Sequence, residues 1–355
     1  MKQNTKMLLA IAIIVAAIIL ISSMQTRPDF SQDKKELSLN STSSRVSAKE
    51  KQYQKAIELV SPDGYINTEN IDLSQYIGKK VILLDFWTYS CINCQRTLPY
   101  LINWHERYND LGLQIIGIHS PEFDFEKDYE NVVKATDKFG IPYPVILDNS
   151  FRTWKAYKNR YWPRKYIIDI DGFIVYDHIG EGGYDETEKI IQKLLKERDL
   201  VLGINSNIPD DMAEVIADKA GYILTPEIYF GYGFSREQLG NKEGWHPEEV
   251  IDYKMPTFIE KNKFYLGGKW INLNDYMESN SDSSIVIKYF AKNINIVAGS
   301  DAGTEINIYN DEKFVKKLMI KDFDLYNLVS SDGSEEHTLR IETGKGLKAY
   351  TFTFG

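Results

Sequence analysis

Apolar residues gather first in one run near the start of the chain. Met7–Ile21 form an unbroken apolar stretch behind Lys2 and Lys6. At about 1.5 Å per residue a helix of this length spans roughly 22 Å, less than a hydrocarbon core of ~30 Å. The pattern predicts an N-terminal hydrophobic helix within residues 1–24, either an uncleaved signal anchor or a cleaved signal peptide. Because lysines precede the run, we expect the body of the protein to lie outside the cytoplasm.

The next segment, residues 25–52, is poor in apolar positions. Five serines fall between Ser38 and Ser47, and the charges alternate in sign. This composition is typical of a flexible tether. Globular patterning begins at residue 53.

Residues 53–200 alternate between continuous apolar runs and amphipathic segments. Val81–Trp87 and Leu113–His119 are apolar throughout, as is typical of strands covered on both faces. A helix is expected to start near Cys91 and another around Asp124–Phe139, and Tyr184–Arg198 has the pattern of an amphipathic helix. Further strands are predicted for Tyr143–Leu147, Lys165–Ile170 and Phe173–His178. The alternation predicts an α/β domain with a central, largely parallel sheet.

The pattern changes after residue 200. Residues 201–262 contain four prolines that interrupt any long element, and we expect an irregular connector there. From residue 263 to 355, short runs with a period of two alternate with turn clusters such as residues 331–333. These runs are Ile285–Phe290, Ile294–Ala298, Glu305–Tyr309, Thr338–Ile341 and Ala349–Phe354. They predict an all-β domain of the sandwich or jelly-roll class, separate in function from the preceding domain.

Composition narrows the classes of function. Of the 355 residues, 43% are hydrophobic and 26% charged, which excludes a wholly disordered protein and suffices for two domains. A formal net charge of −9 argues against a nucleic-acid partner. The chain has only two cysteines and five scattered histidines, so we predict neither a disulfide-stapled scaffold nor a metal site nor a cofactor.

The two cysteines form a Cys-x-x-Cys pair. Cys91-Ile92-Asn93-Cys94 follows directly on the predicted strand Val81–Trp87 and opens a helix. Positive charge at a helix N-terminus favours the thiolate of the first cysteine, which attacks disulfides, while the second resolves the mixed disulfide. Many such pairs are half of a zinc site, but no second pair exists here. The alternative to redox chemistry is an inert structural disulfide.

The residues around the pair resemble a known family. The segment Val81–Tyr100 looks like the active-site region of thioredoxin-like proteins, and Phe86-Trp87-Thr88-Tyr89-Ser90-Cys91-Ile92-Asn93-Cys94 resembles the DipZ-type branch of the TlpA/ResA-like thiol–disulfide oxidoreductases. The C-terminal module, ending Tyr350-Thr-Phe-Thr-Phe354-Gly355, is similar to the one appended in that branch. Full-length members also carry a multi-helix electron-conducting membrane domain, whereas this chain has one hydrophobic segment. The resemblance therefore implies a separate CcdA/DsbD-like membrane electron donor.

The resemblance also implies roles for single residues. Cys91 corresponds to the nucleophile and Cys94 to the resolving thiol. Asp85 matches the buried carboxyl beneath the thiols, whose pKa burial would raise. Glu122 lies where ResA-like proteins place a glutamate near the active site. The other readings are a solvent-facing Asp85 at a strand end and a solvated loop acid at Glu122.

A second group of residues is expected to meet the substrate. Trp162-Pro163 precedes a predicted strand and matches the cis-proline loop of the family, with an ordinary trans turn as the alternative. Trp87 and Tyr89 are expected on the same surface. His119 and Arg164 are expected beside them, in packing rather than chemical roles.

The sequence thus predicts an extracytoplasmic, membrane-tethered thiol–disulfide oxidoreductase. Its clients would be proteins whose disulfides it reduces or exchanges through the Cys91–Cys94 dithiol. The alternative is a cell-surface binding protein, whose C-terminal module recognises a glycan or a protein through its tyrosines, Trp270 and polar turns while the disulfide is not catalytic.

Overall fold

The computed structural model describes residues 42–217, 220–234 and 236–355. The expected hydrophobic helix and most of the expected tether lie outside these residues. Within the tether, Thr42–Glu50 form a helix, α2, which belongs to a unit separate from residues 52–355. Across the described ranges, no helix combines the length and the apolar character that crossing a membrane requires.

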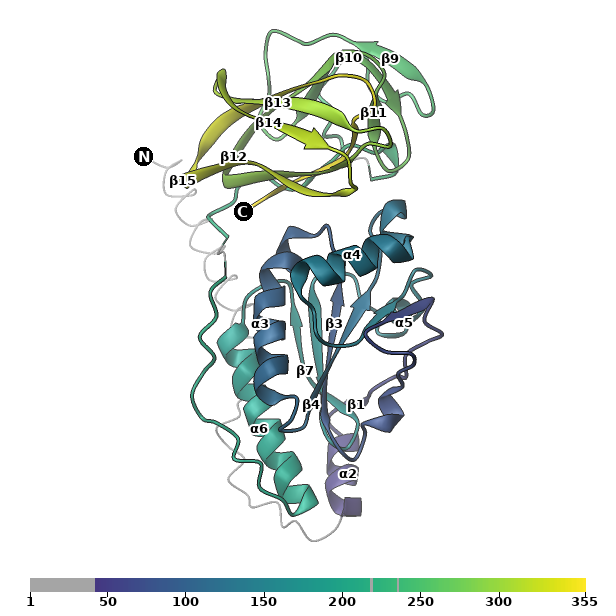
Figure 1. Ribbon diagram of the computed structural model, residues 1–355, viewed down its shortest axis with the longest axis vertical. Helices are drawn as coiled ribbons and strands as arrows, with labels where there is room; N and C mark the ends of the chain where they lie inside the picture. The colour runs from purple at the N-terminus through teal and green to yellow at the C-terminus, as the bar shows by residue number, and fades with distance from the viewer. Residues whose placement is uncertain (1–41, 218–219, 235) are drawn as a thin grey trace, which may run out of the picture. The chain divides into compact units, whose positions relative to one another are not determined.

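Residues 54–202 form an α/β domain around a seven-stranded sheet (Figure 1). The strand order is β1-β7-β6-β3-β4-β5-β2. The strands are β1 (Gln54–Lys55), β2 (Gly64–Ile66), β3 (Val81–Trp87), β4 (Leu113–His119), β5 (Val145–Leu147), β6 (Arg164–Ile168) and β7 (Phe173–Ile179). The helices are η1 (Leu73–Gln75), α3 (Ile92–Tyr108), η2 (Asp124–Lys127), α4 (Tyr129–Phe139), α5 (Arg152–Ala156) and α6 (Tyr184–Leu202).

The central strands are buried on both faces, as their continuous apolar runs predict. In β3, Val81 and Leu83 belong to the core cluster that packs against α3, α4 and α6. The alternate residues Ile82, Leu84 and Phe86 belong to a cluster on the opposite face. Because side chains alternate along a strand, Asp85 points to the face that α3 covers. The sequence therefore places a carboxyl under the first turn of α3.

The sheet is mixed rather than largely parallel. β3 pairs in parallel with β4, and β4 with β5. The remaining strands, β1, β2, β6 and β7, all pair antiparallel. The expectation of a largely parallel sheet is corrected here: the hairpin of β6 and β7 supplies antiparallel strands next to β3.

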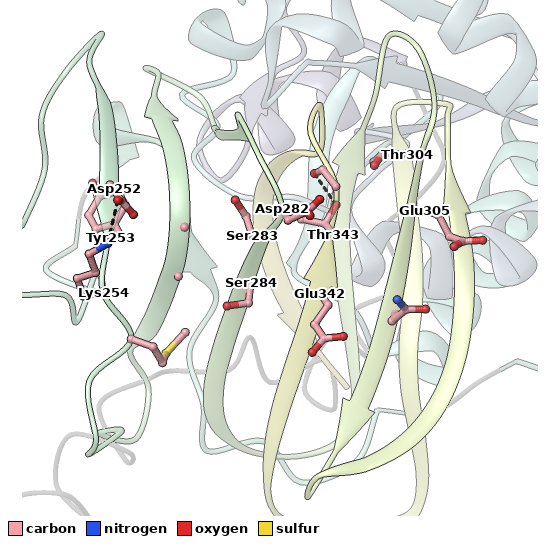
Figure 2. Close-up of a pocket in the computed structure, with 15 residues that line it drawn as sticks. Asp252, Tyr253, Lys254, Asp282, Ser283, Ser284, Thr304, Glu305, Glu342 and Thr343 are labelled. Atoms are coloured by element: carbon pink, nitrogen blue, oxygen red, sulfur yellow. Dashed lines mark hydrogen bonds and ion pairs between the residues drawn. The ribbon is translucent and has the colours of Figure 1, made fainter.

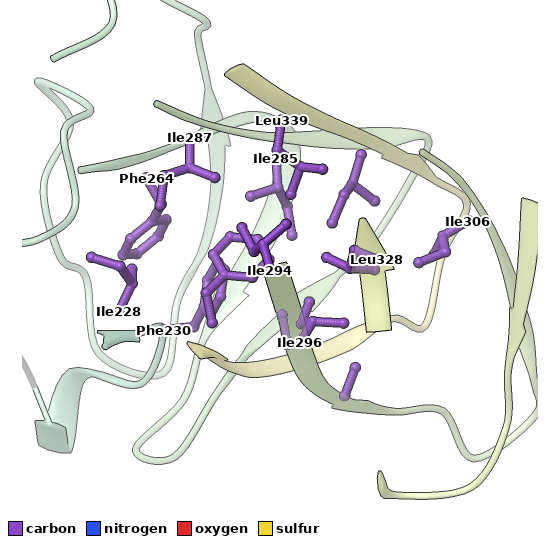
Figure 3. Packing of buried hydrophobic residues seen from close by; sticks show 14 of the residues in the cluster. Ile228, Phe230, Phe264, Ile285, Ile287, Ile294, Ile296, Ile306, Leu328 and Leu339 are labelled. Carbon is purple, nitrogen blue, oxygen red and sulfur yellow. The ribbon is translucent and has the colours of Figure 1, made fainter. Parts of the chain in front are cut away.

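The C-terminal region is all-β, as predicted. Its described strands form one nine-stranded sheet, in which β9 pairs with β10 beside the main path of strands. They are β8 (Ile228–Tyr229), β9 (Val250–Tyr253), β10 (Phe264–Asn272), β11 (Met277–Ser279), β12 (Ser283–Gly299), β13 (Thr304–Asn310), β14 (Lys313–Ile320), β15 (Asp324–Thr343) and β16 (Lys348–Phe354). A short helix, η3 (Tyr232–Phe234), follows β8. Ile285, Ile287, Ile294 and Ile296 of β12 pack with Leu339 of β15 in its core (Figure 3).

Two features of this region differ from the sequence interpretation. The runs Ile285–Phe290 and Ile294–Ala298 belong to one strand, β12, whose register with β15 shifts between Ala291 and Asn293. Residues 331–333, expected as a turn, fall among the extra residues 331–334 of β15 at that irregularity. In addition, β8 and β9 lie within residues 201–262, so the sheet takes in part of the segment expected to be an irregular connector.

Aromatic residues join the two domains. Phe123, between β4 and η2, packs in one buried cluster with Tyr229 of β8, Val297 of β12 and Tyr350 of β16. The Phe123 and Tyr350 rings lie 5.1 Å apart. Lys138 of α4 also forms an ion pair with Asp324 of β15 at 2.5 Å. The all-β domain thus packs against the loop that carries the predicted Glu122.

Candidate active site

The two cysteines lie at the N-terminus of α3. Cys91 is the N-cap residue with an extended backbone, and its Sγ accepts a hydrogen bond of 3.3 Å from the amide of Cys94. Both thiols are free; Cys91 is partly exposed and Cys94 is buried. A donor aimed at a sulfur stabilises negative charge on it. Cys91 therefore has the access and the hydrogen bond of an attacking thiolate.

Cys94 lies in the opposite kind of environment. Burial raises the pKa of its thiol well above the usual value, and the neighbouring Cys91 and Asp85 add to this increase. A hydrogen bond with the Thr88 backbone opposes it. Cys94 is therefore protonated when reduced, and it needs a proton acceptor before it can act as a nucleophile.

Asp85 can supply that acceptor. Its side chain is 1% exposed, and no group in the described ranges donates a hydrogen bond to its Oδ1. Burial raises the pKa of this carboxyl to about 7, against the opposing charge of Lys165. An acid with this pKa exchanges protons readily near neutral pH. The structure thus places Asp85 in the interior rather than at a solvent-facing strand end.

Lys165 is a buried lysine that the sequence interpretation missed. It lies on β6 directly opposite Asp85 in the register with β3, and its Nζ donates to the Gly180 carbonyl at 3.3 Å. Burial lowers its pKa, whereas Asp85, Cys94 and Glu181 raise it. The alternation of Lys165 with the buried Ile167 could have indicated this inward orientation.

The predicted proline loop has the expected backbone. The Trp162–Pro163 peptide bond is cis. The Trp162 indole donates to the Ser120 carbonyl at 2.9 Å and lies 4.3 Å from the Trp154 ring. Arg164, the next residue, pairs with Asp177 at 2.7 Å and does not line the cleft described below.

Three aromatic residues expected near the substrate are buried instead. Trp87 is 1% exposed and Tyr89 is 2% exposed, so neither offers a surface to a substrate in this structure. Trp87 belongs to the α3-facing core with Val81 and Leu83, and the Tyr89 hydroxyl donates to the Phe323 carbonyl of the all-β domain at 3.2 Å. This corrects their assignment as substrate-binding residues. His119 stacks on Tyr89, and burial lowers its pKa to about 3.

Glu126 is a further carboxyl that the sequence interpretation missed. It is fully buried and accepts hydrogen bonds from the Ser90 hydroxyl at 2.7 Å and from the amides of Glu122 and Phe123 at 2.6 and 3.0 Å. These bonds tie the residue before Cys91 to the loop that carries Glu122. Glu126 therefore fixes the position of Glu122 relative to the thiols.

Cys91 and Glu122 both line a cleft of about 770 Å³. Ser90, Asn93 and Trp162 belong to the wall formed by the α/β domain, as do Pro121, Phe151, Arg160 and Tyr161. The opposite wall consists of residues from the all-β region and the segment before it: Ile223, Thr225, Glu227, Tyr229, Phe234, Arg236, Val297, Thr351, Thr353 and Phe354. Cys91 thus opens into a space bounded by both domains, although the C-terminal domain was expected to be separate in function.

Glu122 is held at this cleft by the second domain. Its Oε1 accepts a hydrogen bond of 2.6 Å from the Tyr229 hydroxyl. Burial raises the pKa of Glu122 to about 8, opposed by the Tyr229 hydrogen bond and by Arg236 and assisted by Glu227 and Glu126. Glu122 is thus a partly exposed carboxyl that is bonded to Tyr229 at the cleft wall, rather than a freely solvated loop acid.

The all-β domain has a second cavity, a groove of about 840 Å³ (Figure 2). Its lining is rich in hydroxyl and carboxyl groups, such as Ser284, Thr304, Glu305 and Glu342. Trp270, expected as part of a binding surface, is fully buried in the core and does not line this groove. The structure therefore offers a polar groove without the stacking surface that Trp270 was expected to provide.

One group of acids in the described ranges has metal-like spacing. Single carboxylate oxygens of Asp169, Asp171 and Glu197 lie within 4.8 Å of one another. Asp169 already accepts hydrogen bonds from the amides of Asp171 and Phe173, as expected of a turn. None of the three lines the dithiol cleft, so they add nothing to its chemistry.

Comparison with known proteins agrees with this architecture. Residues 53–177 match the AhpC/TSA family, and residues 225–355 match the family described as thioredoxin-like C-terminal domain. The DipZ protein of Mycobacterium tuberculosis is 36% identical over 305 residues, which are 84% of this chain and 43% of DipZ. These matches support a TlpA/ResA-like protein of the DipZ type.

Smaller relatives match a part of the chain. The thiol-disulfide oxidoreductase YkuV of Bacillus subtilis is 26% identical over 39% of this chain and 93% of its own length. The thiol-disulfide oxidoreductase ResA of Halalkalibacterium halodurans is 27% identical over 40% of this chain and 74% of its own length. The chain spans less than half the length of DipZ.

Proposed function

We propose that this DipZ-type chain is a thiol–disulfide oxidoreductase that acts through Cys91 and Cys94. The observation that carries the proposal is the contrast between the two thiols: Cys91 opens into the cleft at the helix N-cap, whereas Cys94 is buried beside Asp85. Relatives named as thiol-disulfide oxidoreductases support the same activity.

The geometry suggests a two-step reduction. The Cys91 thiolate attacks one sulfur of a client disulfide, that bond breaks, and the other client sulfur leaves with the electron pair and takes up a proton. Asp85 then accepts the Cys94 proton, and the Cys94 thiolate attacks Cys91 Sγ. The second client thiol is released, and the dithiol has become a disulfide after giving two electrons to the client.

We also propose the setting of this reaction. The lysine-flanked apolar run Met7–Ile21 supports an extracytoplasmic protein held at the cell membrane. Its substrates would then be client proteins with disulfides or thiols. A CcdA/DsbD-like membrane protein would return electrons to the Cys91–Cys94 disulfide. Cell fractionation with protease protection tests this location, and a mature soluble protein that starts near residue 25 would contradict the anchor.

An insulin assay tests the activity. With dithiothreitol as the reductant, the wild-type chain should accelerate the reduction and precipitation of insulin. The double variant Cys91→Ser/Cys94→Ser is the control, since it keeps both domains and lacks the dithiol. Equal rates with the wild type and the double variant would contradict the proposal. They would favour a binding protein that acts through the all-β domain, for which the polar groove offers the recognition surface.

A further inference from the structure

In the cleft, one phenol contacts two carboxyl groups, one from each domain. The Tyr229 hydroxyl of β8 lies 2.6 Å from Oε1 of Glu122 and 3.2 Å from Oε2 of Glu227. All three residues line the cleft into which Cys91 opens. A phenol has a single proton to donate. When it donates to Glu122, its oxygen can bond Glu227 only if that carboxyl carries a proton.

The charges around Glu122 come from both domains. Glu126 belongs to η2, whereas Glu227 and Arg236 flank β8 and η3. The Arg236 guanidinium lies over the Tyr229 ring, 4.6 Å from its centre. Two acidic side chains and one cationic side chain therefore act on Glu122, and the Tyr229 hydroxyl donates a hydrogen bond to it.

We propose that Tyr229 is a positioning residue of the thiol site, which holds the Glu122 carboxyl against the cleft and, with Glu227, determines when it releases its proton. The inference rests on the proposed function, since the role given to Glu122 is to protonate the client sulfur that leaves when Cys91 attacks. The electron pair of the broken disulfide stays on that sulfur, Glu122 gives it a proton, and water restores the proton afterwards. The site is then incomplete without the all-β domain.

Two substitutions should move the titration of Glu122 in opposite directions. Tyr229→Phe removes a donor that stabilises the carboxylate, so the pKa of Glu122 should rise above its value of about 8. Glu227→Gln removes a neighbouring negative charge, so the same pKa should fall. Phenylalanine keeps the ring that stacks on Phe234 at 5.0 Å, which preserves the packing around β8.

The test is a carboxyl titration of the full chain by NMR, with 13C-labelled glutamate. Glu122→Gln identifies the signal by its disappearance. Tyr232→Phe is the matched control, because its hydroxyl bonds Glu248 at 2.8 Å in the same domain and does not line the cleft. We expect a wild-type midpoint near 8, a higher one in Tyr229→Phe, a lower one in Glu227→Gln and an unchanged one in the control.

The pH dependence of insulin reduction provides the second readout. In an active protein, the pH at which the rate of insulin reduction falls on the alkaline side should move with the Glu122 midpoint in each variant. If neither substitution moves the Glu122 midpoint, or both move it the same way, the inference is overturned even when the wild type reduces insulin. If the midpoints move as expected but the wild type reduces no insulin, the positioning by Tyr229 stands and the proposed function fails.

Discussion

A carboxyl group lies on each side of the dithiol, and burial raises the pKa of both. The two carboxyl groups differ in which domains supply the groups that act on them. On the inner side, the pKa of Asp85 is about 7, and its opposing charge is Lys165 of the same sheet. On the cleft side, the pKa of Glu122 is about 8, and the groups acting on it come largely from the second domain. The inner side belongs to one domain, whereas the cleft side requires two. Proton transfer to Cys94 and proton transfer to the client should therefore respond to different substitutions.

Removal of either thiol should have the largest effect. Cys91→Ser should abolish exchange, because no other thiol in the chain opens into the cleft. In Cys94→Ser, Cys91 should still attack client disulfides, but the mixed disulfides should not be resolved and should accumulate on Cys91. Non-reducing electrophoresis and mass spectrometry of captured adducts measure both outcomes. Adducts from Cys91→Ser and none from Cys94→Ser would invert the assigned roles.

Asp85→Asn should slow the second step without abolishing the first. Loss of a general base costs on the order of 10²-fold or more in rate. Because Asp85 accepts a proton only when ionised, resolution by the wild type should accelerate as the pH rises through about 7, and Asp85→Asn should lack this rise. Single-turnover decay of a preformed mixed disulfide on Cys91 measures the step. A rise at the same pH in both proteins would exclude Asp85 as the acceptor.

The same substitution should stabilise the fold at high pH. Folding raises the pKa of Asp85 from 3.8 to about 7, so the folded state favours the neutral acid, and the wild type loses stability as the pH rises between these values. The difference corresponds to roughly 4 kcal/mol as an upper bound, since Lys165 loses its counter-charge in the variant. In denaturant unfolding, the free energy of unfolding of Asp85→Asn should increase relative to that of the wild type between pH 4 and pH 8. A gap that is the same at both pH values would contradict the buried carboxyl.

Tyr89→Phe should have a smaller effect, confined to the contact between the domains. It removes the hydrogen bond to the Phe323 carbonyl, a loss of about 1 kcal/mol in the free energy of unfolding. Thermal unfolding of the full chain measures it. A change in KM for insulin without a change in stability would contradict this structural role and would indicate that Tyr89 contacts the substrate.

The sequence predicted best the features that depend on neighbouring residues. β3 and β4 have the expected bounds, because a continuous apolar run marks a strand covered on both faces. The dithiol and Asp85 are separated by only six residues, so one local motif places both. Trp87 and Tyr89 were assigned wrongly because a motif does not say which side chains point outward. The period of two in β3 turns Trp87 inward, and the second domain covers Tyr89.

The rest of the site depends on distant segments. Glu122 and Tyr229 are 107 residues apart, and their contact exists only because β8 joins a sheet that packs on the loop after β4. β8 has only two residues, too few for a recognisable alternation, and it lies in a stretch where prolines suggested a connector. The position of Lys165 also depends on distant segments, since only the register of β6 with β3 places it opposite Asp85.

The order in which the two thiols react tests the central claim most directly. Iodoacetamide should be added to the reduced full chain near neutral pH, quenched at intervals, and the labelled peptides counted by mass spectrometry. Because rate follows thiolate fraction and access, Cys91 should be labelled first, while Cys94, buried and with a raised pKa, should react only slowly. Faster labelling of Cys94, or equal rates for both thiols, would contradict the division of roles on which the account rests.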